Sequence, residues 1–560
     1  MDYITEYKRW CDLAVEDSLK DILLSMDSSQ IEDAFYRNLE FGTGGLRGTI
    51  GAGTNRMNVY TVAKATQGLS NYLIKKYGDK ASVSIGYDSR IKSDLFAKTA
   101  ACVFAANNIK VHLWPTLNPV PTVSFATRYL HTSAGVMITA SHNPSKYNGY
   151  KVYGDDGCQI TTEAAAEILA QIDSTDVFNE IKKVDFDKAV SDGQIVYIDE
   201  SVMTAFINEV KSQSVLFGDE IDTNVSIVYS PLNGTGYIPV TRTLREMGYT
   251  NITLVEEQRL PDGNFPTCPY PNPEIQEAMS LGIQYAEKHN ADLLLATDPD
   301  CDRVGIAVKN IDGQFVLLSG NETGILLLDY ICSQRIKHNT MPSDPVMVKT
   351  IVTMDLGEKV AANYGVKTVD VLTGFKFIGE QIGKLEKSGK EDSYIFGFEE
   401  SYGYLSGGYV RDKDAVNGAY LICEMFAFYK TRGISLLDKL QEIFDKYGFC
   451  LNTLHSFTFE GSAGFSKMQE IMKQFHNEVG VGYSFANKAI HKVLDYSKGL
   501  DGLPKSDVLK YLLEDDCSVV VRPSGTEPKL KTYISVSAKD RTTAENIERS
   551  IVEQLKEFFK

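Results

Sequence analysis

The sequence has no apolar run that approaches the roughly 20 residues needed to cross a bilayer as a helix. Residues 1–6 carry neither the basic segment nor the apolar segment that opens a signal peptide. The nine cysteines are odd in number and show no CxxC or other paired spacing, which fits scattered thiols in a reducing compartment better than a disulfide framework. We therefore expect a cytoplasmic protein with no membrane partner.

Basic residues are also in short supply. The chain has 57 Lys and Arg against 74 Asp and Glu, a formal net charge of −17 at pH 7. This charge argues against nucleic acid or an anionic membrane as the main partner. A site for a phosphate would have to concentrate cations locally against this background. The length of 560 residues is too great for one core and predicts about three or four domains.

A strand–turn–helix–strand pattern occurs three times along the chain. Its copies lie at 83–90, 97–107 and 111–113, then at 225–230, 240–247 and 252–255, and finally at 346–350, 356–364 and 366–371. Three copies predict three similar α/β domains with mixed, largely parallel sheets. Because parallel strands open their binding crevice at their carboxyl ends, we expect turns such as 88–90 to line a central cleft.

The segments outside this pattern complete the expected architecture. Residues 1 to about 40 are predicted to be helical and to pack on the first domain, with Tyr7, Trp10, Leu13 and Ala14 on one face. The proline-rich stretch 261–273 predicts an ordered loop, and the sequence reveals no chemical role for it. The last hundred residues lack the pattern and predict a C-terminal α+β domain. The expected domains are 1–215, 216–312, 313–448 and 449–560.

A hydroxyl follows a predicted buried strand at residues 133–138. The Asn-Pro and Asn-Gly pairs behind this strand predict a tight loop. Ser141 therefore sits where a strand delivers its side chain to a cleft, beside His142 and with lysine on the same loop. This layout is typical of a nucleophilic or phosphate-carrying serine. On these residues alone, an ordinary surface loop is an equal alternative.

Three aspartates follow a second predicted buried strand at 292–297. Asp298, Asp300 and Asp302 occupy alternate positions, so a tight loop would bring their carboxylates to one point. Hard oxygen ligands of this kind suit Mg²⁺. A calcium-binding loop of the EF-hand type is excluded, because its glycine and glutamate positions hold Arg303 and Lys309. An acidic solvated turn is the remaining alternative, and the mutual repulsion of the carboxylates argues against it.

Three further stretches carry candidate binding groups. Five glycines within residues 41–51 surround Arg47 and would let the backbone approach an anion, although a plain turn is the alternative. Glu399 and Ser401 follow an apolar strand and lie two apart, so they could bind neighbouring hydroxyls of a sugar. Residues 522–526 place an arginine, two hydroxyls and a glycine amide together as a possible phosphate cup, where a turn joining two strands is the alternative.

These stretches resemble the motifs of one known family. TASHNP at 139–144, with YNGYK at 147–151, is similar to the phosphoserine loop of the α-D-phosphohexomutases, the superfamily of phosphoglucomutases and phosphomannomutases. Four more motifs occur in family order, namely GTGGLRG at 42–48, DPDCDR at 298–303, GFEES at 397–401 and RPSGTEP at 522–528. The resemblance spans essentially the whole chain. Ser401 is followed by tyrosine rather than histidine, which looks more like the phosphoglucomutases than the phosphomannomutases.

The resemblance implies a role for individual residues. Ser141 would carry a phosphoryl group, and Asp298, Asp300 and Asp302 would hold Mg²⁺ together with it. His142 and Lys151 are candidates for proton transfer, while Arg47 and Lys413 would neutralise charge near the reacting oxygens. The substrate-binding residues that it implies are Arg303, Thr373, Gly374, Glu399, Ser401, Arg522, Ser524, Gly525 and Thr526; the sequence does not decide between Lys529 and Lys531 as a further phosphate contact.

The resemblance also implies an activity. We expect an isomerase-class enzyme, an intramolecular phosphotransferase of carbohydrate metabolism that interconverts glucose 1-phosphate and glucose 6-phosphate. The reaction would pass through a phosphoserine and a bisphosphate intermediate, with glucose 1,6-bisphosphate as activator. The chain looks like the branch that holds bacterial phosphoglucomutases and animal phosphopentomutases. Phosphopentomutase, phosphomannomutase and glucose 1,6-bisphosphate synthase activities therefore stay open.

Alternatives from other classes are a Mg²⁺-dependent phosphatase, which would release inorganic phosphate, and a non-catalytic sugar-phosphate binding protein. The sequence leaves the oligomeric state open between monomer and dimer.

Overall fold

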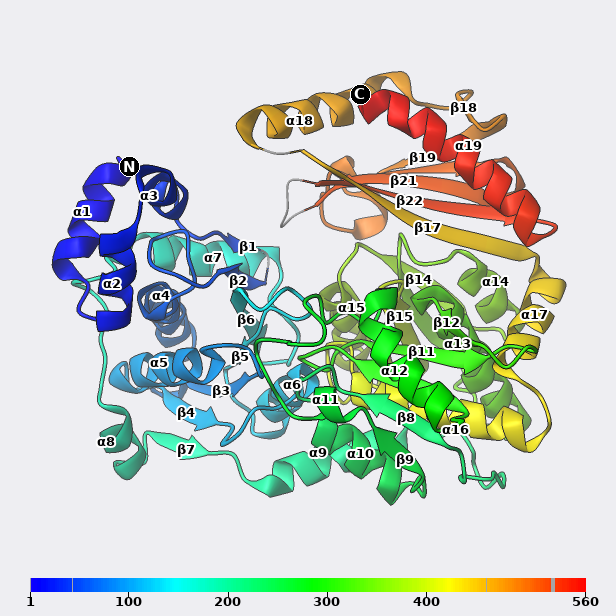
Figure 1. Cartoon of the computed structure of the whole chain (residues 1–560), viewed down its shortest axis with the longest axis horizontal. Coiled ribbons are helices and arrows are strands. Elements are labelled where there is room, and N and C mark those ends of the chain that lie inside the picture. Colours follow the sequence, from blue (N-terminus) through cyan, green and yellow to red (C-terminus); the bar gives the residue numbers. More distant parts are fainter. Residues whose placement is uncertain (1, 43, 460, 525–528, 560) are drawn as a thin grey trace.

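The computed structural model describes residues 2–42, 44–459, 461–524 and 529–559. The chain forms four sheets, of seven, five, four and six strands in chain order, with helices packed around them (Figure 1). The first three sheets are mixed and the last part combines a sheet with helices, which confirms the predicted fold class; that last sheet is antiparallel throughout. Among the described residues, no helix is both long and apolar enough to span a membrane.

The first sheet has the order β1-β2-β6-β5-β3-β4-β7. Its strands are β1 (Phe41–Gly42), β2 (Gly45–Thr49), β3 (Ser82–Tyr87), β4 (Lys110–Leu113), β5 (Ala134–Ile138), β6 (Tyr147–Gly154) and β7 (Ile195–Tyr197). The helices of this part are α4 (Val59–Tyr77), α5 (Ser93–Ala106), α6 (Val120–Tyr129), α7 (Thr162–Asp173), α8 (Phe186–Ser191) and α9 (Glu200–Ser212).

The second and third sheets have the orders β12-β11-β10-β8-β9 and β14-β13-β15-β16. The second part consists of β8 (Ile227–Ser230), α10 (Tyr237–Glu246), β9 (Ile252–Leu254), α11 (Glu256–Arg259), α12 (Gln276–Lys288), β10 (Leu293–Thr297), β11 (Val304–Lys309) and β12 (Phe315–Leu318). The third consists of α13 (Gly320–Lys337), β13 (Val346–Thr350), α14 (Leu356–Asn363), β14 (Lys367–Val371), α15 (Phe375–Lys387), β15 (Tyr394–Glu399), β16 (Gly403–Leu405), α16 (Ala415–Thr431) and α17 (Leu436–Tyr447).

The repeat extends further than the sequence pattern indicates. Each of the first three sheets contains four neighbouring strands in the same arrangement. These are β4-β3-β5-β6 in the first sheet, β9-β8-β10-β11 in the second and β14-β13-β15-β16 in the third. In each unit, helical crossovers join three parallel strands, and a hairpin then adds an antiparallel fourth. The hairpin loops are therefore equivalent positions in the three units, and they carry three of the motifs identified in the sequence.

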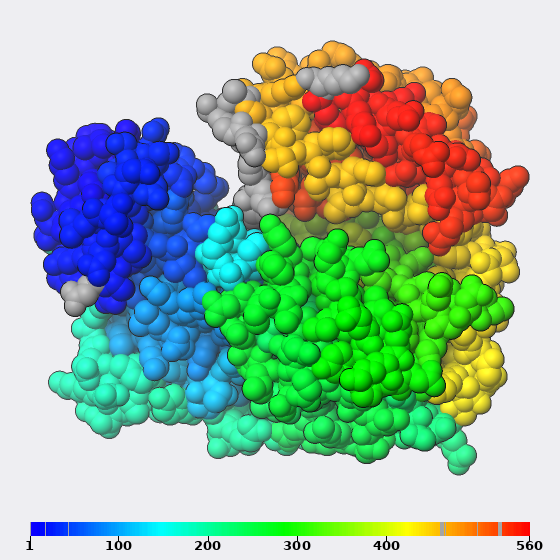
Figure 2. Space-filling view, viewed as in Figure 1, coloured from blue at the N-terminus to red at the C-terminus, as the bar shows by residue number. Residues whose placement is uncertain are grey.

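The C-terminal sheet has the order β17-β22-β21-β20-β19-β18 and is covered by two helices (Figure 1). Its elements are β17 (Phe449–Thr458), α18 (Gly461–Glu478), β18 (Ser484–Phe485), β19 (Lys488–Asp495), β20 (Leu509–Leu513), β21 (Cys517–Pro523), β22 (Lys529–Ala538) and α19 (Arg541–Phe559). Figure 2 shows a hollow between this part and the blue N-terminal part.

The N-terminal segment forms three short helices, α1 (Tyr3–Leu13), α2 (Asp17–Ser25) and α3 (Ser28–Phe35). Trp10 is fully buried and packs edge-on against the rings of Phe35 and Tyr60. The prediction that Leu13 shares this buried face is wrong, because its side chain is 43% exposed at the end of α1. Ala14, the C-cap residue that follows, is fully buried.

The hydrophobic core joins parts that the strand pattern separates. One cluster of buried side chains includes Val123 of α6, Tyr229 of β8 and Phe398 of β15. The six-stranded sheet and its helices enclose a further cluster of their own, with Phe475 and Tyr511 at its centre. The proposed domain boundaries remain a prediction. Strand β12, which lies beyond the proposed boundary at 312, pairs with β11 on its other side.

Gly149 of β6 is a position where the fold tolerates no side chain. A Cβ there would lie 2.4 Å from the Thr139 carbonyl oxygen and 2.8 Å from that of Leu46. We expect Gly149→Ala to cost about 1–3 kcal/mol of stability, because both neighbours are backbone. Gly480→Ala is the control, because nothing lies within 4 Å of its Cβ position. The thermal midpoint measured by calorimetry should fall by several degrees for the first variant only; equal midpoints would contradict this packing.

Candidate functional site

Three hairpin loops meet to form the candidate site. Residues 139–146 join β5 to β6, 298–303 join β10 to β11, and 400–402 join β15 to β16. Each loop holds one non-glycine residue with a positive φ, namely Ser141 at 54°, Cys301 at 54° and Tyr402 at 65°. Side chains in this conformation are uncommon and cluster at functional sites, where the surrounding structure holds them.

Ser141 lies against the aspartate loop. Its Oγ is 3.2 Å from Oδ2 of Asp298 and 3.1 Å from Nδ1 of His142. The backbone N–H of Ser141 donates to Oγ1 of Thr139 at 2.8 Å, which holds the left-handed turn. The serine and the aspartates, 157 residues apart in the chain, are therefore neighbours in space.

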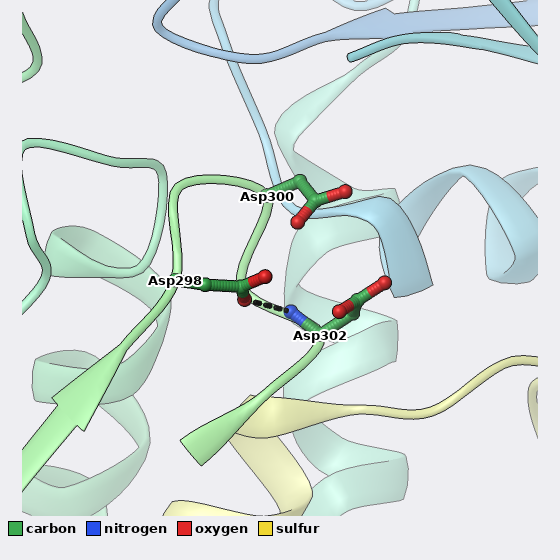
Figure 3. A group of neighbouring side chains, drawn as sticks. All are labelled: Asp298, Asp300 and Asp302. Carbon is green, nitrogen blue, oxygen red and sulfur yellow. Dashed lines mark hydrogen bonds between the residues drawn. The ribbon is translucent and has the colours of Figure 1, made fainter. Parts of the chain in front are cut away.

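The three aspartates converge as Figure 3 shows. All three side chains are fully buried, and one oxygen from each lies within 4.8 Å of the others. Oδ1 of Asp298 accepts the backbone N–H groups of Asp302 and Arg303, both at 3.0 Å. Oδ1 of Asp300 and Oδ1 of Asp302 are buried and accept no hydrogen bond from the described residues. Buried oxygens without partners are costly, and a small divalent cation would satisfy them.

Two lysines approach the other carboxylate oxygens of Asp300 and Asp302. Nζ of Lys151 lies 2.9 Å from Oδ2 of Asp300 and 3.4 Å from Oδ2 of Asp302. Nζ of Lys413 lies 2.8 Å from Oδ2 of Asp302. These cations come from β6 and from the segment before α16, so different parts of the chain supply the charge that the aspartates need.

The pKa values follow from burial and these charges. Burial and the charges of Asp300 and Asp302 raise the pKa of Asp298 well above its ordinary value. Burial alone would also raise the pKa of Asp300, but Lys151 outweighs it and lowers that pKa. Although burial alone would lower the pKa of Lys413, Asp302 raises it. Within the triad, Asp298 is therefore reluctant to ionise, whereas the ionised form of Asp300 is stabilised by Lys151.

His142 and Arg47 flank Ser141. Burial, together with the charges of Arg303 and Arg47, holds the pKa of His142 well below its usual range. Its imidazole is therefore neutral at neutral pH and can accept a proton. Nη1 of Arg47 donates to Oδ1 of Asn143 at 3.2 Å, which ties the glycine-rich strand β2 to the serine loop.

Arg303 has a partner that the sequence did not suggest. Its Nη1 donates to Oε1 of Glu274, and its Nε lies 3.9 Å from Oδ1 of Asp302. Burial opposes its charge, but Glu274 contributes most to raising the pKa of the guanidinium. Glu274 ends the proline-rich stretch, and nothing in its local sequence marks it as a binding residue.

The third hairpin and the turn before α15 hold the predicted sugar-binding groups. Oε1 of Glu399 accepts the backbone N–H of Gly374 at 3.1 Å. Burial raises the pKa of Glu399 to about 7, against the opposing charge of Lys413. Oγ1 of Thr373 is buried and makes no hydrogen bond within the described part of the chain. Ser401 lines a cavity of about 140 Å³ with Glu274.

The C-terminal motif is described only in part. Arg522 lies on β21 opposite Lys531 of β22, and the N–H of Ser524 donates to the carbonyl of Lys529 at 2.7 Å. Arg522 is among the charges that lower the pKa of Glu400, whose pKa burial raises overall. Arg522 is therefore within electrostatic reach of the third hairpin. The predicted residues Gly525 and Thr526 lie outside the described residues.

Sequence reasoning missed the support beneath the serine loop. The turn 88–90 was expected to line the central cleft, and for Asp88 and Arg90 this is wrong, because they are 2% and 3% exposed and contact the serine loop from beneath. Oδ2 of Asp88 accepts the Thr139 hydroxyl at 2.6 Å, and that hydroxyl also lies 3.1 Å from Oδ2 of Asp300. The Asp-x-Arg spacing after a buried strand was the available signal.

Comparison with known proteins gives one consistent result. Four family models match, described as phosphoglucomutase/phosphomannomutase alpha/beta/alpha domains I, II and III and C-terminal domain, at residues 38–178, 204–313, 319–447 and 476–554.

Individual relatives agree with these models. The chain is 36% identical to a phosphoglucomutase of Staphylococcus saprophyticus over 95% of this chain and 96% of that protein. It is also 36% identical to one of Staphylococcus haemolyticus, over 90% and 92%. Among solved structures, the open form of the Paramecium phosphoglucomutase parafusin matches with a TM-score of 0.68 and 18% identity, over 93% of this chain and 96% of that one.

The buried triad predicts opposite effects of one substitution with and without metal. Asp298→Asn keeps an acceptor oxygen for the two backbone N–H groups but removes one of three like charges. In EDTA we expect a higher thermal midpoint than in the parent protein. The difference between the two thermal midpoints should increase as pH rises, because the raised pKa of Asp298 means that its ionisation destabilises the folded parent protein. With Mn²⁺, calorimetric titration should show affinity reduced by more than about 100-fold, beyond the typical effect of changing a ligand's hydrogen-bond partner.

Asp312→Asn, at an exposed turn between β11 and β12, is the matched control for Asp298→Asn and should change neither quantity. Unchanged Mn²⁺ affinity in the Asp298 variant would rule out the triad as a metal site.

Proposed function

The chain belongs to the phosphoglucomutase/phosphomannomutase family of the α-D-phosphohexomutases, and from this we propose that it interconverts glucose 1-phosphate and glucose 6-phosphate. Family membership makes it an enzyme of the isomerase class that acts as an intramolecular phosphotransferase. The observation that carries the proposal is the 3.2 Å approach of the Ser141 hydroxyl to Asp298. It places a phosphorylatable oxygen beside a buried cluster of carboxylates suited to a divalent cation.

In the proposed reaction, phosphorylated Ser141 donates its phosphoryl group to the free hydroxyl of the sugar phosphate. The bond between Oγ and phosphorus breaks, the bond from the sugar oxygen forms, and the hydroxyl proton leaves to a base. The bisphosphate so formed turns end for end and returns its other phosphate to Ser141. In the return transfer the Ser141 hydroxyl loses its own proton as its oxygen takes up a phosphoryl group, and His142 suits the role of base there, because its imidazole is neutral and lies 3.1 Å from that oxygen.

The remaining charges of the site would stabilise the transfer. Mg²⁺ bound by Asp298, Asp300, Asp302 and the Ser141 oxygen would supply positive charge beside the transferring group. Lys151 stays protonated, because Asp300 and Asp302 raise its pKa against the effect of burial. We therefore assign Lys151, Lys413, Arg47 and Arg303 to charge neutralisation rather than to proton transfer.

The other predicted residues would hold the two ends of the substrate. We assign the binding of sugar hydroxyls to Glu399, Ser401, Thr373 and Gly374. The hydroxyl oxygen of Thr373 is buried and has no hydrogen-bond partner among the described residues, which supports this assignment. Arg522 and Ser524, with Gly525 and Thr526 of the same motif, would bind the distal phosphate. A cup that accepts either phosphate allows the intermediate to bind in both orientations, and glucose 1,6-bisphosphate would serve as activator by phosphorylating Ser141.

The proposed setting is a reducing cytoplasm. All nine cysteines are free, which supports this setting. Each proposed domain contributes one part of the site. Residues 1–215 contain the serine loop, 216–312 the metal loop, 313–448 the sugar loop and 449–560 the phosphate cup.

Turnover measurements on alternative substrates test the proposal. The purified chain should convert glucose 1-phosphate faster than ribose 1-phosphate or mannose 1-phosphate, with faster turnover when glucose 1,6-bisphosphate is added. Ser141→Ala should abolish turnover and the mass increase of one phosphoryl group in the intact protein, while Ser145→Ala in the same loop should retain both. Release of inorganic phosphate at the same rate would instead identify a phosphatase, and turnover by Ser141→Ala would refute the phosphoserine route.

Arg522 offers a second test at the opposite end of the site. Arg522→Ala removes the cation of the proposed cup, so the apparent affinity for glucose 1-phosphate should fall by roughly 10-fold or more, as expected for a charge-assisted contact. The affinity for Mn²⁺ should change little, because the triad lies on another sheet. Unchanged KM for the sugar phosphate would argue against the cup.

A further inference from the structure

We propose that residues 261–274, which we name the strap, position the serine loop and the aspartate loop relative to each other, with Phe265 and Glu274 as its positioning residues. The inference rests on the proposed function and assigns a role to the proline-rich stretch, which the sequence left without one. Near its first residues the strap contacts Arg90, which supports the serine loop. At its last residue it contacts the aspartate loop.

The strap is fixed to the second sheet. The N–H of Asp262 donates to the carbonyl of Asn233 at 3.0 Å, and the side chain of Asn233 donates to the carbonyl of Leu260 at 2.9 Å. Nε2 of Gln258 donates to Oγ1 of Thr267 at 3.0 Å. These contacts fasten the strap to the segments around β8 and α11, so it can transmit the position of the second sheet to its neighbours.

At its beginning, the strap packs on the first sheet. A Cβ on Gly263 would lie 2.4 Å from the backbone nitrogen of Ile91, so the two chain segments are in close contact. The next contact is Phe265, which is 1% exposed and has a φ of 49°. The guanidinium carbon of Arg90 lies 5.1 Å from the centre of its ring, within the range of a cation–π interaction.

Arg90 in turn donates hydrogen bonds to the backbone of the serine loop. Nη1 donates to the carbonyls of Pro144 and Tyr147 at 3.0 and 3.1 Å, and Nη2 donates to those of Ser141 and Asn143. One planar cation thus holds three carbonyls of the serine loop and the carbonyl of Tyr147, the first residue of β6. That cation lies over the ring of Phe265, so the ring limits the movement of the guanidinium and with it the position of Ser141.

At its end, the strap holds the aspartate loop. A Cβ on Gly305 of β11 would lie 2.8 Å from atoms of Pro273, which brings the strap against the strand that follows the loop. Glu274 then accepts from Nη1 of Arg303, the last residue of that loop. One continuous segment therefore contacts both Arg90, which holds the serine loop, and Arg303, which follows Asp302 in the aspartate loop. A shift of about 1 Å between reacting groups can cost about 100-fold in rate.

Phe265→Leu tests the first contact. It keeps an apolar side chain but removes the ring face under Arg90. We expect kcat to fall by about 10- to 100-fold with little change in KM for glucose 1-phosphate. Backbone amides in peptides covering 139–147 should exchange with deuterium at least about 10-fold faster. Phe428→Leu is the matched control, because Phe428 carries Arg432 over its ring at 3.6 Å, on α16 and away from the loops.

Glu274→Ala tests the second contact. It should raise deuterium exchange in peptides covering 298–305 and lower kcat by about 10-fold, while Glu274→Gln, which still accepts a hydrogen bond from Arg303, should recover most of the rate. Glu246→Gln is its control, since Glu246 pairs with Lys211 and Arg242 at a similarly half-exposed site remote from the loops. If Phe265→Leu does not fold, Arg90→Lys tests the same contact. Its ammonium group cannot donate to four carbonyls at once, so deuterium exchange in 139–147 should again be faster.

The outcomes separate this inference from the proposed function. The strap would be overturned as a positioning element if deuterium exchange in both loops were unchanged in the variants. It would also be overturned if kcat fell equally in the two control variants. Faster exchange in the variants of a protein that turns over no hexose phosphate would leave the strap standing and reject the proposed function.

Discussion

The structure depends on one electrostatic constraint, the burial of three carboxylates in a single six-residue loop. Asp298, Asp300 and Asp302 are all fully buried, with oxygens within 4.8 Å of one another. Like charges at this separation cannot all ionise without compensation. The compensation comes from elsewhere in the chain, with Lys151 on β6 and Lys413 before α16 in direct contact. The loop therefore requires three sheets to meet, and the position of Ser141 among them follows from the same requirement.

The repeated topology explains how three loops reach one point. Each of the first three units ends with a hairpin from its third parallel strand to an antiparallel fourth, and each hairpin contributes to the site. The strands before the hairpins are buried on both faces, as in β10 and β15, so the loops are delivered from rigid supports. In the proposed function, the same supersecondary unit thus supplies a nucleophile, a set of metal ligands and a sugar-binding carboxylate, and the residues in and next to each hairpin loop determine its role.

The sequence predicts the parts of this site that are contiguous in the chain. The strand pattern predicts three α/β units, and Ser141 and the aspartates stand out because each follows a buried strand within a short motif. Residues that act through distant contacts carry no such signal: Arg90 grips carbonyls 51–57 residues away, and Glu274 binds an arginine 29 residues on. Leu13 was misplaced for a local reason, because helical periodicity does not show where a short helix ends.

The charges of the site also couple the metal to the substrate. The ammonium groups of Lys151 and Lys413 pair with Asp300 and Asp302, and Arg303 pairs with Glu274. A divalent cation on the aspartates would neutralise part of their charge and so weaken their attraction for Lys151 and Lys413. The freed ammonium groups could then face a phosphate. In a chain with a net charge of −17, an anionic substrate needs this local excess of positive charge. Metal and sugar phosphate should therefore strengthen each other's binding, because each neutralises a charge that otherwise opposes the other.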